Sequence, residues 1–275
     1  MTLVSGKASM LTSHAARLDL AAPLAELAEQ GYARLGHVLA ADALASLRER
    51  AEDLMLGRVC HPGLFFQLDA ETGRYEDAPI GLGWQGPSLA YRKLEKLEKD
   101  ERFRAWINNP LFERIARTSI ADGVVIYRAV LFNKASSAGS DIPWHQDGGQ
   151  LWGLSREPEL QIWTALDDAP VDGGCLEFIP GSHRQGLATA LGGVVPEPQV
   201  RSADAARRAT PVPVRAGEAL LIHNQVWHRS GRNLPGQRRL AFSICYMSAS
   251  TRCTRKKRAP REFCPVFRAR SDELG

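Results

Sequence analysis

The stretch Val124-Val-Ile-Tyr-Arg-Ala-Val-Leu-Phe132 decides the fold class. It is rich in β-branched and aromatic residues, as is typical of a buried strand, and the turn pair Asp122-Gly123 precedes it. From there to Met247, short apolar runs alternate with turns that contain glycine or proline. Because there is no βαβ alternation, this pattern predicts a mainly β sandwich or barrel of jelly-roll type. The further strands are expected at Gln161–Leu166, Cys175–Ile179, Thr210–Val214, Glu218–His223 and Arg239–Tyr246.

The residues before this region predict a mostly helical layer outside the sheet. Ala22–Gln30 has helical periodicity, and Gly31 followed by Tyr32-Ala-Arg-Leu predicts a stop and a short strand. A second helix is expected to open at Ala41-Asp42, with Asp42 as N-cap, and to end at Gly57. Its apolar face consists of Leu44, Leu47, Ala51 and Leu54.

A third helical region is expected at Leu89–Thr118, where Asn108-Asn109-Pro110 starts the last helix. The buried stripe of that helix is expected at Leu111, Ile115 and Thr118. Two further segments are expected to be irregular. Arg58–Ser88 is rich in glycine, proline and aromatic residues, and it fits a substrate-side flap as well as a surface loop that contains a hairpin. Pro196–Arg208 is expected to be an inserted polar loop.

The length of 275 residues suits a single domain, with a helical layer and flap over 1–122, a jelly-roll core over 123–250 and a basic tail over 251–275. The apolar fraction of 44% and the charged fraction of 24% exclude disordered and fibrous classes. We expect the tail to be a solvated extension, because no nucleic-acid-binding motif accompanies its charge. Its basic residues are Arg252, Arg255, Lys256, Lys257, Arg258, Arg261, Arg268 and Arg270.

Five scattered cysteines without a CxxC pair indicate neither a zinc ribbon nor a disulfide framework. The first twenty residues have no continuous apolar segment, and no run is long enough to cross a bilayer. We therefore expect a protein of the reducing cytoplasm with no membrane or nucleic-acid partner. A monomer and a homodimer are both compatible with the sequence.

His145 and Asp147 lie at the centre of Ile142-Pro-Trp-His-Gln-Asp-Gly-Gly149. At the end of a strand, residues two apart point to the same side, so this imidazole and this carboxylate are expected to share one space. Gly148 and Gly149 let the backbone turn beside them. An imidazole and a carboxylate form two thirds of the facial triad that holds non-haem Fe(II) with open coordination positions.

His228 is the candidate for the third ligand, because it follows an apolar strand and has Ser230 on the same face. His223 is the nearest rival, although a histidine that closes an apolar strand is more often hydrogen-bonded in the core. Arg239 opens the final strand and offers a planar guanidinium fork that matches a carboxylate. Its neighbour Arg238 is expected to form a surface salt bridge.

Several ordered blocks resemble the phytanoyl-CoA dioxygenase family, whose members are Fe(II)- and 2-oxoglutarate-dependent oxygenases with a double-stranded β-helix (cupin-like) core. The blocks are Pro143-Trp-His-Gln-Asp147, Asp172-Gly-Gly-Cys-Leu-Glu-Phe-Ile-Pro-Gly-Ser-His183, and Gly217-Glu with His228, Ser230, Asn233 and Arg239. The resemblance covers roughly 89–247 and implies that His145, Asp147 and His228 bind iron. It implies that Arg239, assisted by Ser230, binds the C5 carboxylate of 2-oxoglutarate.

The resemblance also implies roles for three residues around the cosubstrate. Trp163 matches a position that lines the 2-oxoglutarate pocket, although a core aromatic would look the same. Gln146 is expected to point away from the metal and to support the edge of the site. Lys93 resembles a lysine near the cosubstrate, although its Lys- and Glu-rich surroundings favour a solvated role.

The implied reaction uses O₂ to hydroxylate or otherwise oxidise a C–H bond of a small molecule, and it releases succinate and CO₂. Asp147 favours hydroxylation, since an alanine or glycine there would have indicated a halogenase. The alternatives are a cupin-type metal isomerase or hydrolase and a non-catalytic 2-oxoglutarate or metal sensor. The flap Arg58–Ser88, the loop Gln150–Arg156 and the insert Gln185–Arg208 are expected to line the entrance to the site. Their aromatic residues Phe65, Phe66, Trp84 and Trp152 favour an apolar or ring-bearing substrate, and Arg156 or Arg184 could meet an anionic group.

Overall fold

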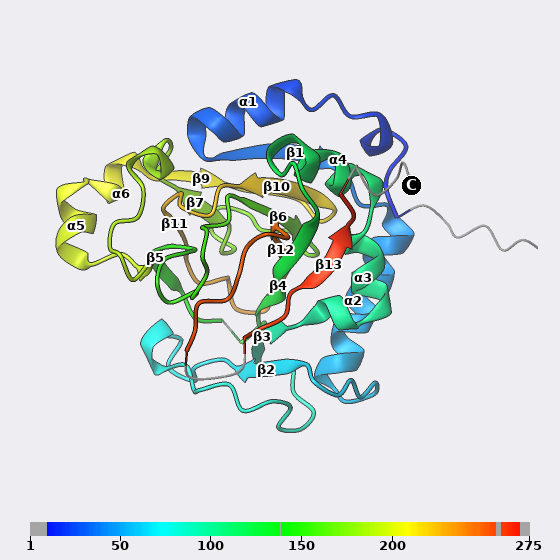
Figure 1. Cartoon of the computed structure of the whole chain (residues 1–275). Helices are drawn as coiled ribbons and strands as arrows, with labels where there is room; N and C mark the ends of the chain where they lie inside the picture. The colour runs from blue at the N-terminus through cyan, green and yellow to red at the C-terminus, as the bar shows by residue number, and fades with distance from the viewer. Residues whose placement is uncertain (1–9, 138, 257–259, 270–275) are drawn as a thin grey trace, which may run out of the picture.

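Two antiparallel sheets form the centre of the protein (Figure 1). The computed structural model describes residues 10–137, 139–256 and 260–269. The larger sheet has the order β1-β10-β6-β12-β4-β3-β2, with β13 also paired to β4, and the smaller sheet has the order β8-β5-β11-β7-β9. The strands are β1 (Tyr32–His37), β2 (Phe65–Leu68), β3 (Tyr91–Glu95), β4 (Val124–Lys134), β5 (Ile142–Gln146), β6 (Leu160–Ala165), β7 (Leu176–Phe178), β8 (Gly193–Val194), β9 (Thr210–Val212), β10 (Glu218–Ile222), β11 (His228–Ser230), β12 (Arg239–Ser248) and β13 (Cys264–Phe267).

The two sheets face each other and enclose an apolar cluster that includes Trp163, Phe178, Leu220 and Ala241. Strand side chains alternate between faces, so each long strand of the larger sheet contributes one set of residues to this interior and one to the opposite face. The prediction of a mainly β, jelly-roll core with N-terminal helices is confirmed.

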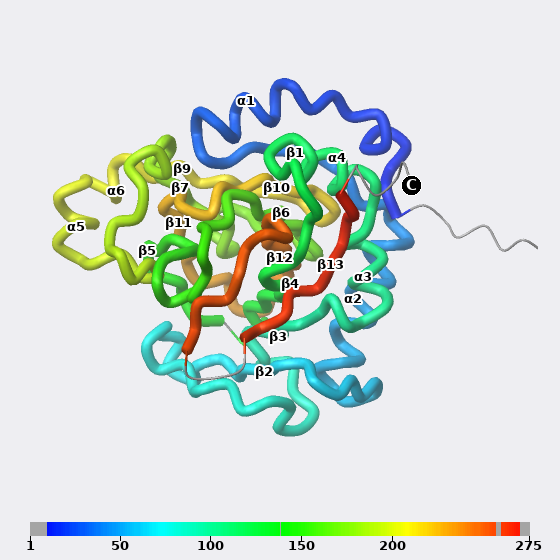
Figure 2. Tube along the Cα trace, viewed as in Figure 1, coloured from blue at the N-terminus to red at the C-terminus, as the bar shows by residue number. Residues whose placement is uncertain are grey.

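Helices cover the outer face of the larger sheet (Figures 1 and 2). The α-helices are α1 (Ala21–Gln30), α2 (Ala41–Met55), α3 (Glu101–Ile107), α4 (Pro110–Ser119), α5 (Glu197–Ser202) and α6 (Ala205–Arg208). Short 3-10 turns occur at η1 (Ala15–Arg17), η2 (Tyr75–Asp77), η3 (Leu97–Lys99) and η4 (Ser182–Gln185). Helix α1 ends where Gly31 takes a left-handed conformation, and β1 starts at the next residue, as the sequence predicts.

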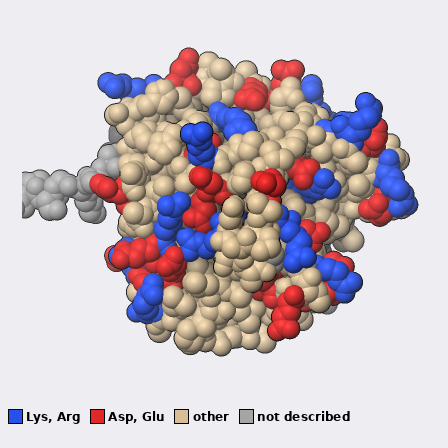
Figure 3. Space-filling view, turned by 180° about the vertical axis from the view of Figure 1, so that it is seen from behind, with Lys and Arg blue, Asp and Glu red and all other residues tan. Residues whose placement is uncertain are grey.

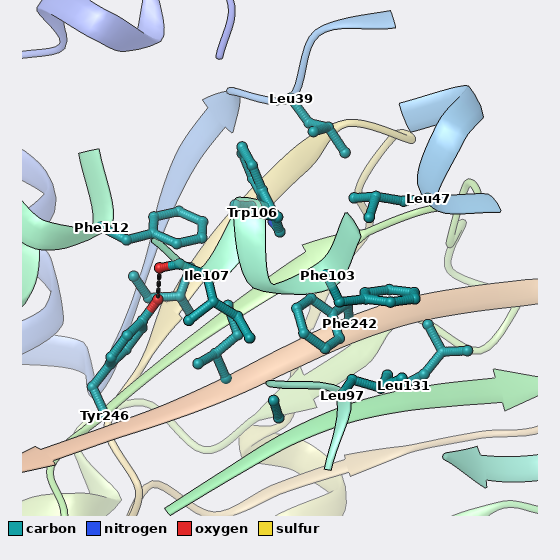
Figure 4. Close-up of a cluster of buried hydrophobic side chains, with 14 of the residues drawn as sticks. Leu39, Leu47, Leu97, Phe103, Trp106, Ile107, Phe112, Leu131, Phe242 and Tyr246 are labelled. Carbon is teal, nitrogen blue, oxygen red and sulfur yellow. Dashed lines mark hydrogen bonds between the residues drawn. The ribbon is translucent and has the colours of Figure 1, made fainter. Parts of the chain in front are cut away.

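The main core lies between the helices and the larger sheet (Figure 4). Trp106 of α3 packs edge-on against Phe112 of α4, and its ring nitrogen donates a hydrogen bond to Thr164 Oγ1 on β6 at 3.1 Å. The hydroxyl of Tyr246 on β12 donates to the Ile107 carbonyl at 2.8 Å. These hydrogen bonds satisfy the polar atoms of two buried aromatic side chains. Apolar packing and directional hydrogen bonds therefore both hold the helices on the sheet.

Four local predictions about the helical segments are wrong. Ala40, not Asp42, is the N-cap of α2, and Asp42 lies in the first turn. In α4 the predicted start is correct, because the Asn109 side chain caps the helix, but Thr118 is exposed and the stripe continues through Phe112 and Ala116. The residues from 91 to 95 form strand β3 rather than helix. The expected polar loop at 196–208 contains helices α5 and α6.

The irregular segment 58–88 contains strand β2, which pairs with β3 in an antiparallel hairpin at the edge of the larger sheet. Phe66 of β2 is buried in the main core, where it contacts the ring of Tyr91 edge-on. The segment therefore combines one structural strand with a loop; its partner strand lies outside the segment, so the hairpin expected within 58–88 is not found, and the role of the loop as a substrate-side flap stays a prediction.

The C-terminal segment is not the expected solvated extension over residues 260–269. Strand β13 pairs with β4, and Phe267 is buried in the main core. The Arg261 guanidinium lies over the Tyr127 ring at 4.9 Å and donates to the Tyr127 carbonyl. Packing on β4 therefore outweighs the local charge. Lys257, Arg258 and Arg270 lie outside the described residues.

On the face shown in Figure 3, basic and acidic side chains are interspersed rather than gathered into a patch of one sign. Within residues 10–137, 139–256 and 260–269, no helix has both the length and the apolar character needed to cross a bilayer.

Candidate active site

The three predicted metal ligands converge between the two sheets. His145 on β5 and His228 on β11 are direct partners in the antiparallel register, and Asp147 immediately follows β5. The amide of Asp147 donates to the carbonyl of Asn224 at 2.8 Å, which fixes the turn after the strand. One ligand atom from each of the three side chains lies within 4.8 Å of the other two. This spacing allows a single ion to contact all three.

Each histidine has its outer ring nitrogen held by the backbone. Nδ1 of His145 lies 2.9 Å from the Pro143 carbonyl, and Nδ1 of His228 lies 3.0 Å from the Val226 carbonyl. Because a carbonyl oxygen can only accept, Nδ1 carries the proton in both rings and the Nε2 lone pair is free. The His228 Nε2 lies 3.8 Å from Asp147 Oδ2. This is the usual arrangement of histidines that bind a metal through Nε2.

The electrostatics of the cavity favour the protonation states that bind metal. Burial lowers the pKa of His145 to about 3, and the neighbouring His228 adds to the effect. Burial also lowers the pKa of His228. For Asp147, burial is the largest influence and alone would raise the pKa, but the charge of Arg128, the two histidines and the hydrogen bond from Gln161 together outweigh it and hold the pKa below its ordinary value. At neutral pH the site therefore presents two neutral imidazoles and one carboxylate.

Two residues beside Asp147 were missed by the sequence reasoning. Arg128 Nη2 on β4 and Gln161 Nε2 on β6 each donate to Asp147 Oδ2 at 2.7 Å. Both bonds go to the same oxygen, so Oδ1 keeps its lone pairs for another partner. The available signal was a charged residue inside an otherwise apolar strand, since Arg128 interrupts the run that decides the fold.

Arg239 and Ser230 lie in the same cavity and have unused hydrogen-bonding capacity. Arg239 is 2% exposed, and its Nε is buried without a partner; the buried hydroxyl of Ser230 also has none. The Arg239 guanidinium lies over the Trp163 ring at 5.9 Å. Burial lowers the pKa of Arg239 to about 10, so it remains charged at neutral pH. In the described chain no carboxylate lies within 4.0 Å of it, although its neighbour Arg238 pairs with Asp167 and Glu52 as predicted.

The polar groups of Gln146, Lys93 and His223, the remaining candidates, have other partners than the triad. The Gln146 amide points away and bonds the backbone, donating to Gly186 and Gln225 and accepting from Ala188. Lys93 lines the cavity from a strand, not a helix, and its Nζ pairs with Glu95 at 2.6 Å. The rival ligand His223 contacts the His183 ring in a tilted arrangement, with ring centroids 4.7 Å apart, and takes no part in the triad.

The cavity has a volume of about 210 Å³, and its entrance differs from the one predicted. Among the four expected aromatics, Trp152 lines it, Phe66 is in the core, and Trp84 donates to the Met55 carbonyl at 3.3 Å. Phe65 and Arg184 are also absent from the lining, and Arg156 lines a separate pocket. The residues that line the cavity also include Tyr75, Arg92, Phe132, Ile142 and Val194.

The phytanoyl-CoA dioxygenase (PhyH) family matches residues 27–241, which include all three candidate ligands and Arg239. The chain belongs to this family. Phytanoyl-CoA dioxygenase domain-containing protein 1 of Bos taurus is 30% identical over 158 residues, which are 55% of this chain and 54% of that protein. The chain therefore spans about half the length of such curated relatives. L-proline trans-4-hydroxylase of Streptomyces griseoviridis is 27% identical over 205 residues, covering 64% of this chain and 75% of the relative.

Solved structures support the fold assignment of this phytanoyl-CoA dioxygenase family member. The epimerase SnoN from nogalamycin biosynthesis, solved with Fe³⁺, α-ketoglutarate and nogalamycin RO, superposes with a TM-score of 0.69 at 20% identity over 90% of this chain and 95% of SnoN. EctD from S. alaskensis, solved with 2-oxoglutarate and 5-hydroxyectoine, gives 0.68 at 19% identity over 96% of this chain and 89% of EctD. Family membership and the His-Asp-His triad support an iron- and 2-oxoglutarate-dependent oxygenase activity.

Proposed function

We propose that this protein is an Fe(II)- and 2-oxoglutarate-dependent dioxygenase that hydroxylates an unactivated C–H bond of a small molecule. One observation carries the proposal: a His-Asp-His cluster shares a cavity with a buried guanidinium that has no carboxylate partner among the residues the structure describes. Family membership supports the same conclusion.

The donor set fits Fe(II). Two neutral imidazoles and one carboxylate provide three ligand atoms on one side of an ion, which leaves further positions for other ligands. His145 and His228 are oriented by backbone carbonyls, and Asp147 is oriented by Arg128 and Gln161. When bound, Fe(II), O₂ and 2-oxoglutarate supply the oxidation of the C–H bond, with succinate and CO₂ as the other products.

The second half of the site fits a dicarboxylate. A buried cation without a partner is costly, and a planar guanidinium binds a carboxylate through two parallel hydrogen bonds. Arg239 would hold the carboxylate that lies far from the metal, and the Ser230 hydroxyl would donate to the same group. Trp163 forms the wall beside the guanidinium. In this proposal Lys93 and Gln146 support the site from its edge, because their polar groups already have partners.

Arg239, the proposed anchor for the far carboxylate of 2-oxoglutarate, also distinguishes this function from the alternatives. A metal hydrolase or isomerase needs the triad, but it does not need a buried, unpaired guanidinium in the same cavity. A sensor would use the triad and the anchor alike, so the two functions differ only in whether succinate is released.

The proposal is tested by anaerobic titration with Fe(II) and then 2-oxoglutarate, followed by admission of O₂ and measurement of succinate. We expect one Fe(II) per chain, 2-oxoglutarate binding that is lost in Arg239→Ala, and succinate formation that is lost in Asp147→Ala. Arg238→Ala is the matched control, because the adjacent arginine faces Asp167 and Glu52 instead of the cavity. Binding of 2-oxoglutarate without succinate, across a metabolite screen, would favour the sensor. Equal 2-oxoglutarate binding by both arginine variants would contradict the anchor.

A further inference from the structure

The charges inside the cavity are not balanced by the proposed metal and cosubstrate. Fe(II) and the 2-oxoglutarate dianion carry equal and opposite formal charge. The charge of Lys93 is neutralised by Glu95 at 2.6 Å. Of the remaining charges, the two positive ones of Arg239 and Arg128 exceed the one negative charge of Asp147. Arg92 also lines the cavity and lies over the Tyr75 ring at 4.9 Å, and in the described chain no carboxylate lies within 4.0 Å of it. The occupied site therefore keeps a net positive charge in a region of poor hydration, which favours an anionic ligand.

Arg128 is the cation placed to meet that ligand. In the register of the larger sheet, Arg128, Cys245 and Gln161 lie side by side on β4, β12 and β6. The next inward-facing row contains Ser243 and Trp163, and Arg239 lies further along β12. Since strand residues rise about 3.3 Å each, Arg128 lies far from Arg239, at the metal end of the cavity. It is thus separate from the proposed 2-oxoglutarate anchor.

The Arg128 side chain is preorganised and still has capacity to bind. Its guanidinium lies over the Trp152 ring at 4.7 Å, and that ring stacks on Tyr127 with centroids 4.2 Å apart. One terminal nitrogen holds Asp147 at 2.7 Å, while Nε is buried without a partner. A guanidinium that is held by an indole ring and a carboxylate has few orientations to lose when a second carboxylate binds.

The described lining of the cavity offers no free carboxylate that could pair with an ammonium group. Among the described residues that line it, Asp147 is the single carboxylate, and its charge is committed to the metal and to Arg128. The lining also includes the apolar side chains of Phe132, Ile142 and Val194. An amino acid would leave its ammonium desolvated beside two guanidinium groups, which costs free energy.

We propose that the substrate of this protein is an organic acid with an apolar body and no ammonium group, and that Arg128 binds its carboxylate. The inference rests on the proposed function and names its substrate class. It distinguishes this chain from a relative such as L-proline trans-4-hydroxylase, whose name specifies an amino acid. Arg128 thereby has two contacts, one to Asp147 and one to the substrate.

The test measures the thermal stability of the protein under anaerobic conditions with Fe(II) and 2-oxoglutarate. The probes are matched sets at millimolar concentration: 3-phenylpropanoate, 3-phenylpropanamide and phenylalanine, and butanoate, butanamide and 2-aminobutanoate. In at least one set we expect the acid to bind about tenfold to hundredfold more tightly than the amide, as for a hydrogen bond to a charged group, and more tightly than the amino acid. In Arg128→Gln the preference for the acid over the amide should disappear.

Gln161→Met is the matched control, since it removes the other donor to Asp147 and leaves the Arg128 charge. It should retain the preference for the acid. If Arg128→Gln does not fold, Arg128→Lys should show a weaker preference than the wild type, because the ammonium lacks the planar fork. An unchanged preference in either Arg128 variant overturns the inference, as does an amide or amino acid that binds as tightly as its acid in every set.

The response to 2-oxoglutarate alone separates the two proposals. If 2-oxoglutarate stabilises the Fe(II)-loaded protein and no acid exceeds its amide, the substrate inference fails and the proposed function stands. If 2-oxoglutarate gives no stabilisation, the proposed function fails and the inference fails with it.

Discussion

Replacing Arg239 by leucine should stabilise the protein without ligands and abolish its response to 2-oxoglutarate. The guanidinium is 2% exposed and has no carboxylate partner in the described chain. Burial lowers its pKa from 12.5 to about 10, which corresponds to a cost of about 3 kcal/mol for keeping the charge in the folded state at neutral pH. The leucine loses the contact with the Trp163 ring and leaves some empty volume. We therefore expect a net gain of about 1–2 kcal/mol in the free energy of unfolding.

The assay is urea unfolding of the metal-free protein, with and without Fe(II) and 2-oxoglutarate. A ligand at about one hundred times its dissociation constant stabilises the protein that binds it by about 2.7 kcal/mol. The wild type should show an increase of this size, and Arg239→Leu should show none. A stable protein that has lost its ligand response would identify Arg239 as a binding residue and not a structural one.

Arg238→Leu provides the opposite control at the adjacent position. Arg238 pairs with Asp167 at 2.8 Å and Glu52 at 2.6 Å, so its removal takes one ion pair from each carboxylate, although Arg48 still pairs with Asp167 at 3.1 Å. We expect a loss of about 1–2 kcal/mol with the 2-oxoglutarate response intact. The reasoning is refuted if Arg239→Leu is the less stable of the two variants without ligand, or if it still responds to 2-oxoglutarate.

Three further predictions concern single side chains. Asp147→Ala should abolish succinate formation, and a variant that still forms succinate would remove the carboxylate from the ligand set. Gln146→Leu should lower the free energy of unfolding by about 3 kcal/mol in urea, at about 1 kcal/mol for each backbone hydrogen bond lost; an unchanged value would contradict the supporting role. Burial, with the nearby His183, lowers the pKa of His223 from 6.5 to about 4. Its unfolded form takes up a proton first as the pH falls, so stability is lost between about pH 6.5 and pH 4. In His223→Gln the loss between pH 7 and pH 4.5 should be smaller by about 2 kcal/mol, and equal losses in both proteins would contradict this assignment.

The sequence predicts the elements whose pattern is set by local burial. The run at 124–134 is largely buried on both faces and is therefore mostly apolar, and the strands β6, β10 and β12 could be predicted for the same reason. The triad could be predicted because His145 and Asp147 are two residues apart at a strand end, where chain geometry alone places them together.

Elements that depend on distant partners could not be predicted in this way. Strand β3 is rich in Lys and Glu and has the local composition of a helix, but pairing with β4 and β2 determines its conformation. Strand β13 follows a basic segment and is likewise fixed by β4. The contacts of Arg128 and Gln161 with Asp147 join three strands, so the register of the folded sheet was needed to find them.

The central claim is that three side chains hold one iron ion beside a diacid anchor. The most direct measurement is a crystal structure of the protein loaded anaerobically with Fe(II) and 2-oxoglutarate, with anomalous scattering recorded at the iron edge. The account predicts one anomalous peak in contact with Nε2 of His145, Nε2 of His228 and a carboxylate oxygen of Asp147, and 2-oxoglutarate with its far carboxylate on Arg239. An iron peak elsewhere, or 2-oxoglutarate bound away from Arg239, would contradict it.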